Sequence, residues 1–323
     1  MTVDGLPTLP YLPPWYRVAT APGKVVLEYG QRIVSLEGGA ADRLVPALLA
    51  VLDGTRTVDE IVLLLGAPVR PAIEKALGEL VAHGVLVEGP PASTELPRPV
   101  AGTAELLASL GSANGAVAET VASVAGCSVA VAGAGSAGLE AARLLRTAGA
   151  TVTRAEAICA GTDLVVAAPA ACELPVLAQW NAEAIEARQP WLQVLPFDGR
   201  HGAVGPLYLP GDTACHECFR RRLLANLGAA EEVPLLEATA AAYPAATAVD
   251  AVLGALAALV ALAWLALRNH YVPGAFFAFE LLPTPSLSVH HVHRVPRCVA
   301  CSGTGDVAPP LPWYKEVPVG RVH

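Results

Sequence analysis

The chain has 323 residues, enough for one large domain or two smaller ones, and its 54% hydrophobic residues are typical of a folded protein. A formal net charge of −8 argues against nucleic-acid binding, because residues 220–222 form the only dense basic run. The N terminus lacks the pattern of a signal peptide, so we expect a cytoplasmic protein whose paired cysteines bind metal rather than form disulfides.

The first 90 residues predict a small domain in which three strands precede three helices. Strands are predicted at residues 15–20, 24–29 and 32–36, and helices at residues 40–52, 57–65 and 70–83. The second helix begins with a capping box, in which Thr57 is the N-cap and Glu60 is the third helical residue. With a closing strand at residues 85–87, this order is typical of a winged helix-turn-helix domain.

Residues 91–125, a proline-bearing linker and a lead-in helix, precede an α/β region that spans residues 126–323. Short apolar runs predict strands at residues 127–132, 151–153, 164–168, 192–196, 207–209 and 276–282. Strands that alternate with helices indicate a parallel, Rossmann-like sheet. The uncharged residues 251–267 are mostly alanine and lie between Asp250 and Arg268, so we expect a buried central helix and no membrane span.

Two cysteine pairs predict one metal site. Cys215 with Cys218, and Cys298 with Cys301, each place two thiolates three residues apart, the spacing that tetrahedral zinc requires. Four thiolates leave no position for water, so we expect a structural zinc ion that ties a C-terminal segment to the rest of the domain. Unrelated or redox-active pairs are the alternative interpretation. Nearby histidines are alternative ligands: His216, His290, His291 and His293.

Three further cysteines, Cys127, Cys159 and Cys172, stand alone. Cys172 lies in a loop-like context and is a candidate for thioester formation. No neighbouring base is identifiable in the sequence, so a buried or unused thiol is the preferred interpretation.

A glycine-rich loop follows the first predicted strand of the α/β region. Gly133, Gly135 and Gly138 stand between a strand and a helix, where backbone N–H groups can face a phosphate. The acidic residue that should follow about 20 positions later, to bind a ribose, is missing, because only Glu156 occurs there and it lies past the strand. The loop therefore predicts the fold more strongly than a nucleotide site, and whether it is a vestigial loop or still binds a nucleotide stays open.

Residues 204–222, which include the run Pro-Gly-Asp-Thr-Ala-Cys-His-Glu-Cys, resemble a signature of ThiF-like proteins. The closer resemblance is to the branch found in gene clusters for thiazole/oxazole-modified peptides, and it covers about residues 126–305. Cys298 and Cys301 stand where this branch places its second zinc-binding pair. Residues 1–90 resemble, by pattern, the PqqD-like peptide-recognition domain fused ahead of such proteins.

Together these resemblances imply an ocin-ThiF-like partner protein with a winged helix-turn-helix domain before a Rossmann-like ThiF-type domain. Such proteins bind the leader of a ribosomal precursor peptide and present its core to a YcaO-type cyclodehydratase. That cyclodehydratase, not the partner, uses ATP to form azolines. The sequence has no lysine between Lys75 and Lys315 to stabilise charge on a triphosphate, so we expect no catalytic residues and no enzymatic activity in this chain.

The resemblance also implies where a leader would bind. The leader would add as a strand along residues 32–36, with its apolar side chains entering a groove beside the helix at residues 70–83. Which side chains face the leader rather than the core stays open, and Arg32, Arg70 and Lys75 would contact acidic leaders. The full set of expected contacts is Arg32, Ile33, Val34, Ser35, Leu36, Arg70, Ile73, Lys75 and Leu77.

Three alternatives remain at this stage. A DNA-binding winged helix is disfavoured by the mixed charges of residues 70–83. An active adenylating enzyme of the ThiF or ubiquitin-activating type would hold ATP at residues 133–138 and act on a peptide. A nicotinamide-dependent oxidoreductase would need the missing ribose-binding acid. ThiF-like relatives commonly dimerise, so a homodimer is possible.

Overall fold

The computed structural model describes residues 5–30, 32–39, 41–89, 96–110, 117–226, 232, 235, 241 and 243–302. The chain divides into two compact units. The first unit comprises residues 1–126 together with 147–150, and the second comprises residues 127–146 and 151–323. The predicted domain boundaries and the winged helix-turn-helix assignment stay predictions.

The first unit contains a three-stranded antiparallel sheet in the order β2-β3-β4. Its strands are β2 (Arg17–Ala21), β3 (Lys24–Tyr29) and β4 (Arg32–Glu37). Because side chains alternate across a strand, Val25, Leu27, Val34 and Leu36 all enter the core beneath the sheet. β4 pairs with β3 along one side, and no described strand pairs with its other side.

Helices complete this core: α1 (Leu44–Leu49), α2 (Val58–Leu65), η1 (Ala67–Val69) and α3 (Arg70–Ala82). The predicted capping box of α2 is confirmed, because Glu60 N–H donates to the Thr57 hydroxyl (3.3 Å) and Thr57 N–H donates to the Glu60 carboxylate (2.8 Å). The helical spacing of Ile73, Leu77 and Leu80 puts all three in the core. A short pair of strands, β1 (Pro10–Tyr11) and β5 (Val87–Glu88), lies beside them.

Two helices, α4 (Arg98–Leu110) and α5 (Val117–Ala125), follow. We expected one helical stretch at residues 104–124, and its middle part, residues 111–116, lies outside the described residues. The two helices share a small core with Tyr11 and Val87.

The second unit contains a seven-stranded mixed sheet in the order β12-β11-β10-β9-β8-β6-β7. The strands are β6 (Ser128–Ala132), β7 (Thr151–Ala155), β8 (Leu164–Ala167), β9 (Trp191–Leu195), β10 (His201–Tyr208), β11 (Ala275–Glu280) and β12 (Ser286–His291). β7, β6, β8 and β9 run parallel, and β10 to β12 continue the sheet antiparallel. The predicted α/β class is confirmed, and β8 is buried on both faces, as a parallel strand between helices requires.

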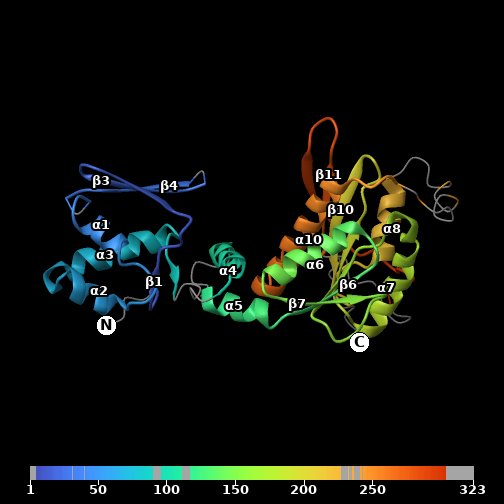
Figure 1. Ribbon diagram of the computed structural model, residues 1–323, viewed down its shortest axis with the longest axis horizontal. Coiled ribbons are helices and arrows are strands. Elements are labelled where there is room, and N and C mark those ends of the chain that lie inside the picture. Colours follow the sequence, from blue (N-terminus) through green and yellow to red (C-terminus); the bar gives the residue numbers. More distant parts are fainter. Residues whose placement is uncertain are drawn as a thin grey trace, which may run out of the picture. The chain divides into compact units, whose positions relative to one another are not determined.

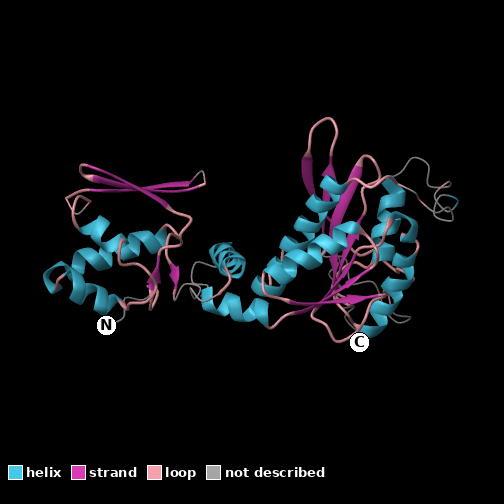
Figure 2. Ribbon diagram, viewed as in Figure 1, coloured by secondary structure: helices cyan, strands magenta, loops and turns pink. Residues whose placement is uncertain are grey.

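Helices cover both faces of this sheet, α6 (Ser136–Thr147) and α10 (Thr247–Leu267) on one side and α7 (Val176–Ala187) and α8 (His216–Asn226) on the other (Figures 1 and 2). α10 corresponds to the predicted central helix and packs on β8, β9 and β10. Among the described residues it alone is long and apolar enough to cross a membrane, and half of its most apolar stretch is buried. Gly254 lies where α10 crosses α6, since a Cβ there would be 2.6 Å from the Ala137 carbonyl oxygen.

Candidate functional site

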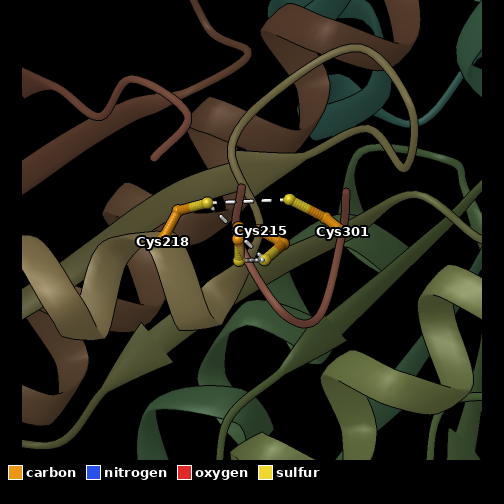
Figure 3. Close-up of side chains that lie close together, drawn as sticks. Cys215, Cys218 and Cys301 are labelled. Atoms are coloured by element: carbon orange, nitrogen blue, oxygen red, sulfur yellow. Dashed lines mark hydrogen bonds between the residues drawn. The ribbon is translucent and has the colours of Figure 1, made fainter. Parts of the chain in front are cut away.

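Four cysteines converge in the second unit. The Sγ atom of Cys215 is 3.8 Å from that of Cys218 and 3.8 Å from that of Cys298, and Cys218 Sγ is 3.6 Å from Cys301 Sγ. A tetrahedral ion with Zn–S bonds of about 2.3 Å separates its sulfur ligands by about 3.8 Å. Figure 3 shows the side chains of Cys215, Cys218 and Cys301 pointing toward one another. The predicted four-cysteine cluster is confirmed as a group able to hold a metal ion.

Local structure positions these thiols. Cys215 immediately precedes α8 and Cys218 lies in its first turn, while Cys298 and Cys301 come from a tight turn after β12. Val295 N–H donates to Cys218 Sγ (3.3 Å), which ties the two segments together. Burial raises the pKa of Cys215. At Cys298 burial opposes ionisation, but hydrogen bonds from the backbone N–H groups of residues 300 and 301, together with those from Cys218 and Cys215, lower the thiol pKa. Burial also raises the pKa of Cys301 to about 11.

Two arginines hold the second cysteine pair in place. The Arg222 guanidinium donates to the carbonyl oxygens of His293 (2.6 Å) and Arg294 (3.0 Å). The Arg294 guanidinium in turn donates to the carbonyl oxygens of Gly211 and Cys301, both at 3.0 Å. The basic run at residues 220–222 therefore serves, in part, to attach the C-terminal segment.

The histidines proposed as alternative ligands lie outside the group that can hold a metal. His216 Nδ1 is 2.6 Å from the Gln193 side-chain oxygen, and its backbone N–H donates to the Asn181 side chain (2.9 Å). Asn181 on α7 thus caps the first turn of α8. No sequence pattern predicts this buried polar group, because its members are distant in sequence.

The glycine-rich loop connects β6 to α6, as predicted, and its three glycines are required by packing. A Cβ on Gly133 (φ +95°) would lie 2.4 Å from the Ala168 carbonyl oxygen, and one on Gly135 would lie 2.8 Å from the same atom. A Cβ on Gly138 would lie 2.7 Å from the Ala168 side chain. The turn at residues 168–169 therefore accounts for the glycine pattern, since no larger residue fits against it.

Two N–H groups at the centre of this loop already have protein partners. Gly135 N–H donates to the Ala168 carbonyl (2.9 Å), and Ala134 N–H donates to the Glu173 carboxylate (3.1 Å). Arg154 stands at the end of β7, in the region of the missing ribose-binding acid, and donates to the Gly133 carbonyl (2.9 Å). The N–H groups of Ala134 and Gly135 are among those with which such a loop binds phosphate, so the loop with these internal contacts does not fit the phosphates of a nucleoside triphosphate.

The expected leader contacts on the first unit fall into two groups. Arg32, Ile33 and Ser35 are exposed on β4, and Ile33 is 65% exposed. Four side chains belong to the core instead: Val34, Leu36, Ile73 and Leu77. Peptide binding at these positions stays a prediction. Val34 and Leu36 could contribute through the β4 backbone, and Ile73 and Leu77 could contribute only by packing in the core.

The two cations expected on α3 already have acidic partners. Arg70 contacts Asp59 (2.7 Å) and Glu74 (3.2 Å), and the side-chain hydrogen bonds from these two residues raise the pKa of Arg70. Lys75 Nζ is 4.0 Å from the Glu79 carboxylate. A leader that contacted Arg70 would compete with two carboxylates.

Comparison with known proteins finds similarity in structure. No protein-family model matches the sequence, and no curated protein matches it. The heterocyclase TruD superposes with a TM-score of 0.70 at 26% identity over 91% of this chain, and a heterocyclase in complex with substrate and cofactor gives 0.69 at 23%. The chain spans 43% of the length of TruD and 39% of the second heterocyclase.

MccB of E. coli, in a structure with ATP, superposes with a TM-score of 0.67 at 13% identity. Here 91% of this chain covers 99% of MccB. A second structure contains MccB, a microcin C7 biosynthetic enzyme, in complex with N-formylated MccA. At this identity the likeness concerns the fold alone.

These neighbours correct one prediction. TruD is a heterocyclase, so the similarity to TruD contradicts the expectation that this chain is not an enzyme. The absence of lysine between residues 75 and 315 argues only against stabilisation of the charge on a bound triphosphate. It does not exclude other enzymatic activities. The resemblance to proteins of ribosomal peptide modification is supported by the same neighbours.

Proposed function

We propose that this chain is the peptide-binding component of a heterocyclase that modifies a ribosomally made precursor peptide in the cytoplasm. It binds the leader and acts together with a YcaO-type cyclodehydratase, and the assembled enzyme closes Cys, Ser or Thr side chains into azolines. The similarity to TruD over 91% of this chain carries the proposal. More than half of TruD has no counterpart in these residues, and in the proposal the cyclodehydratase supplies it.

The open edge of β4 supports leader binding. An edge strand offers unpaired N–H and C=O groups, and an extended peptide that pairs with them gains affinity with little dependence on sequence. β4 carries the exposed Arg32 and Ile33 and, on its outer side, has no partner among the described strands. Arg32 would attract acidic leaders, while Ile33 would add apolar contact.

Fluorescence polarisation with leader peptides from the neighbouring genes tests this site in the full chain. Ile33→Asp should weaken binding at least tenfold, because it places a charge where the leader buries an apolar group. Val18→Asp is the matched control, since Val18 is 40% exposed on β2 at the opposite edge of the same sheet. Equal affinity of both variants and the unmodified protein would rule out the β4 site.

We propose that the cysteine cluster holds zinc. Four thiolates in tetrahedral arrangement suit zinc, and a site without an open position stabilises structure rather than activating water. Elemental analysis should give about one zinc ion per chain. Cys215→Ser should lose it, and Cys172→Ser should keep it, because Cys172 is exposed and outside the cluster. Full zinc content in Cys215→Ser would contradict the shared site.

A second candidate is an adenylating enzyme that acts on a peptide, and the match to the whole length of MccB favours it. On the comparisons alone this activity has the broader support, whereas the contacts of the glycine-rich loop favour the heterocyclase component. ATP–pyrophosphate exchange that depends on added precursor peptide distinguishes them. Peptide-dependent exchange by the purified chain would establish adenylation and overturn the first proposal. Light scattering tests the homodimer, which both candidates allow.

A further inference from the structure

The glycine-rich loop is surrounded by carboxylates from other parts of the second unit. Glu173, at the end of the short helix η2 (Ala171–Glu173), accepts from Ala134 N–H (3.1 Å) and Ala170 N–H (2.9 Å) with the same oxygen. Asp250 in the first turn of α10 accepts from the Ser136 hydroxyl (2.5 Å) at the start of α6. Both carboxylates therefore lie where the N terminus of α6 attracts negative charge.

Two hollows lie beside this loop. One, of ≈ 220 Å³, is lined by residues 134–137 and Asp250, and the other, of ≈ 520 Å³, is lined by Arg154, Glu156 and Glu173. Ala134 lines both, and its N–H donates to Glu173, which lines the larger hollow. A ligand that used the Ala134 N–H group from the larger hollow would have to compete with the Glu173 carboxylate.

The charges of the lining oppose an anionic ligand. Among the described residues that line the two hollows, Arg154 is the one cation, whereas there are three carboxylates: Glu156 and Glu173 beside it in the larger hollow, and Asp250 in the smaller one. The Arg154 guanidinium is also hydrogen-bonded to the Gly133 carbonyl. A phosphate chain entering this region would meet negative charge with little compensation.

We infer that Glu173 is an internal ligand of the glycine-rich loop, whose carboxylate fills the position that the phosphate of a nucleotide would need. The carboxylate satisfies Ala134 N–H, holds the turn after β8 against the loop and closes the crevice to nucleotides. The loop thus has the backbone conformation of a phosphate-binding loop, and the Glu173 carboxylate takes the place of the phosphate. This inference concerns the loop alone, so a failure of leader binding would leave it unaffected.

Thermal unfolding and calorimetry of the full chain test this inference, with inorganic phosphate and ATP, each with and without Mg²⁺, as probes. For the unmodified protein, neither probe should change the melting temperature relative to sodium chloride of equal ionic strength. Glu173→Ala should melt about 2–4 °C lower. Phosphate should restore part of that loss, because the emptied loop then accepts an external anion.

Two further variants control for charge and for general damage. Glu173→Gln keeps a side-chain oxygen that accepts the same hydrogen bonds, so it should melt near the unmodified protein and ignore phosphate. Glu186→Ala removes an exposed carboxylate of α7 and should also ignore phosphate. If Glu173→Ala does not fold, Glu173→Ser carries the same expectation, since its side chain is uncharged and shorter by two heavy-atom positions.

Either of two results would overturn the inference. The first is stoichiometric binding of ATP by the unmodified protein, with or without Mg²⁺, that Glu173→Gln retains. The second is a folded Glu173→Ala or Glu173→Ser variant that responds to phosphate no more than Glu186→Ala does. In the first case the loop is a working nucleotide site, and in the second the Glu173 carboxylate does not stand in for an anion.

Discussion

The cysteine cluster and the glycine-rich loop lie in the same unit and differ in what they leave for a ligand. The four thiols converge on one point, with three Sγ–Sγ distances of 3.6–3.8 Å. In the loop, by contrast, Ala134 N–H and Gly135 N–H already bond to Glu173 and Ala168. A cysteine motif identifies the atoms that would bind a metal ion. A glycine motif identifies only a backbone conformation, and close packing without any ligand is enough to require that conformation.

The largest effect that tests this contrast is loss of the metal. Cys298→Ser removes one ligand from a buried cluster, and a structural zinc site contributes about 10 kcal/mol to folding, so we expect the second unit to unfold or aggregate. Circular dichroism and metal content check this together, with Cys172→Ser as control. A Cys298→Ser protein that lacks metal and melts like the unmodified chain would show that the cluster stabilises nothing.

A smaller effect is expected at the loop. Gly133→Ala places a Cβ against the Ala168 carbonyl at a φ of +95° and should lower the free energy of unfolding by about 3 kcal/mol. Gly161→Ala is the matched control, because Gly161 has a φ of +91° with no atom within 4 Å of its Cβ position, and it should cost about 1 kcal/mol. Denaturant titration measures both. Equal costs would mean that packing does not explain the glycine.

The smallest effect concerns the attachment of the second cysteine pair. Arg222→Ala removes hydrogen bonds to the carbonyls of His293 and Arg294, and we expect a loss of about 1 kcal/mol. Arg220→Ala removes a looser ion pair with Glu217, at 3.7 Å, and should cost less than about 0.5 kcal/mol. Chelator-induced zinc release should be faster in Arg222→Ala than in Arg220→Ala, and equal rates would contradict the attachment role.

Local patterns in the sequence predicted much of this structure. Three features follow from residue spacing within one short segment or one cysteine pair. They are the capping box of α2, the parallel strands around β6 and the convergence of the cysteines. Glu173 and Asn181 could not be predicted, since each acts on a segment more than 30 residues away. For Ile73 and Leu77 the helical period predicted a shared face but not whether that face meets core or peptide, and both are buried.

The separation of the two cysteine pairs also has a consequence for synthesis of the protein. Cys298 and Cys301 follow β12, the last strand of the described sheet, so the ribosome makes all seven strands before the second pair exists. In the zinc-bound protein that we propose, complete coordination of the ion is therefore a late event. A chain that stalls before residue 298 could not hold the ion with all four thiols, and metal occupancy would then distinguish finished molecules from truncated ones.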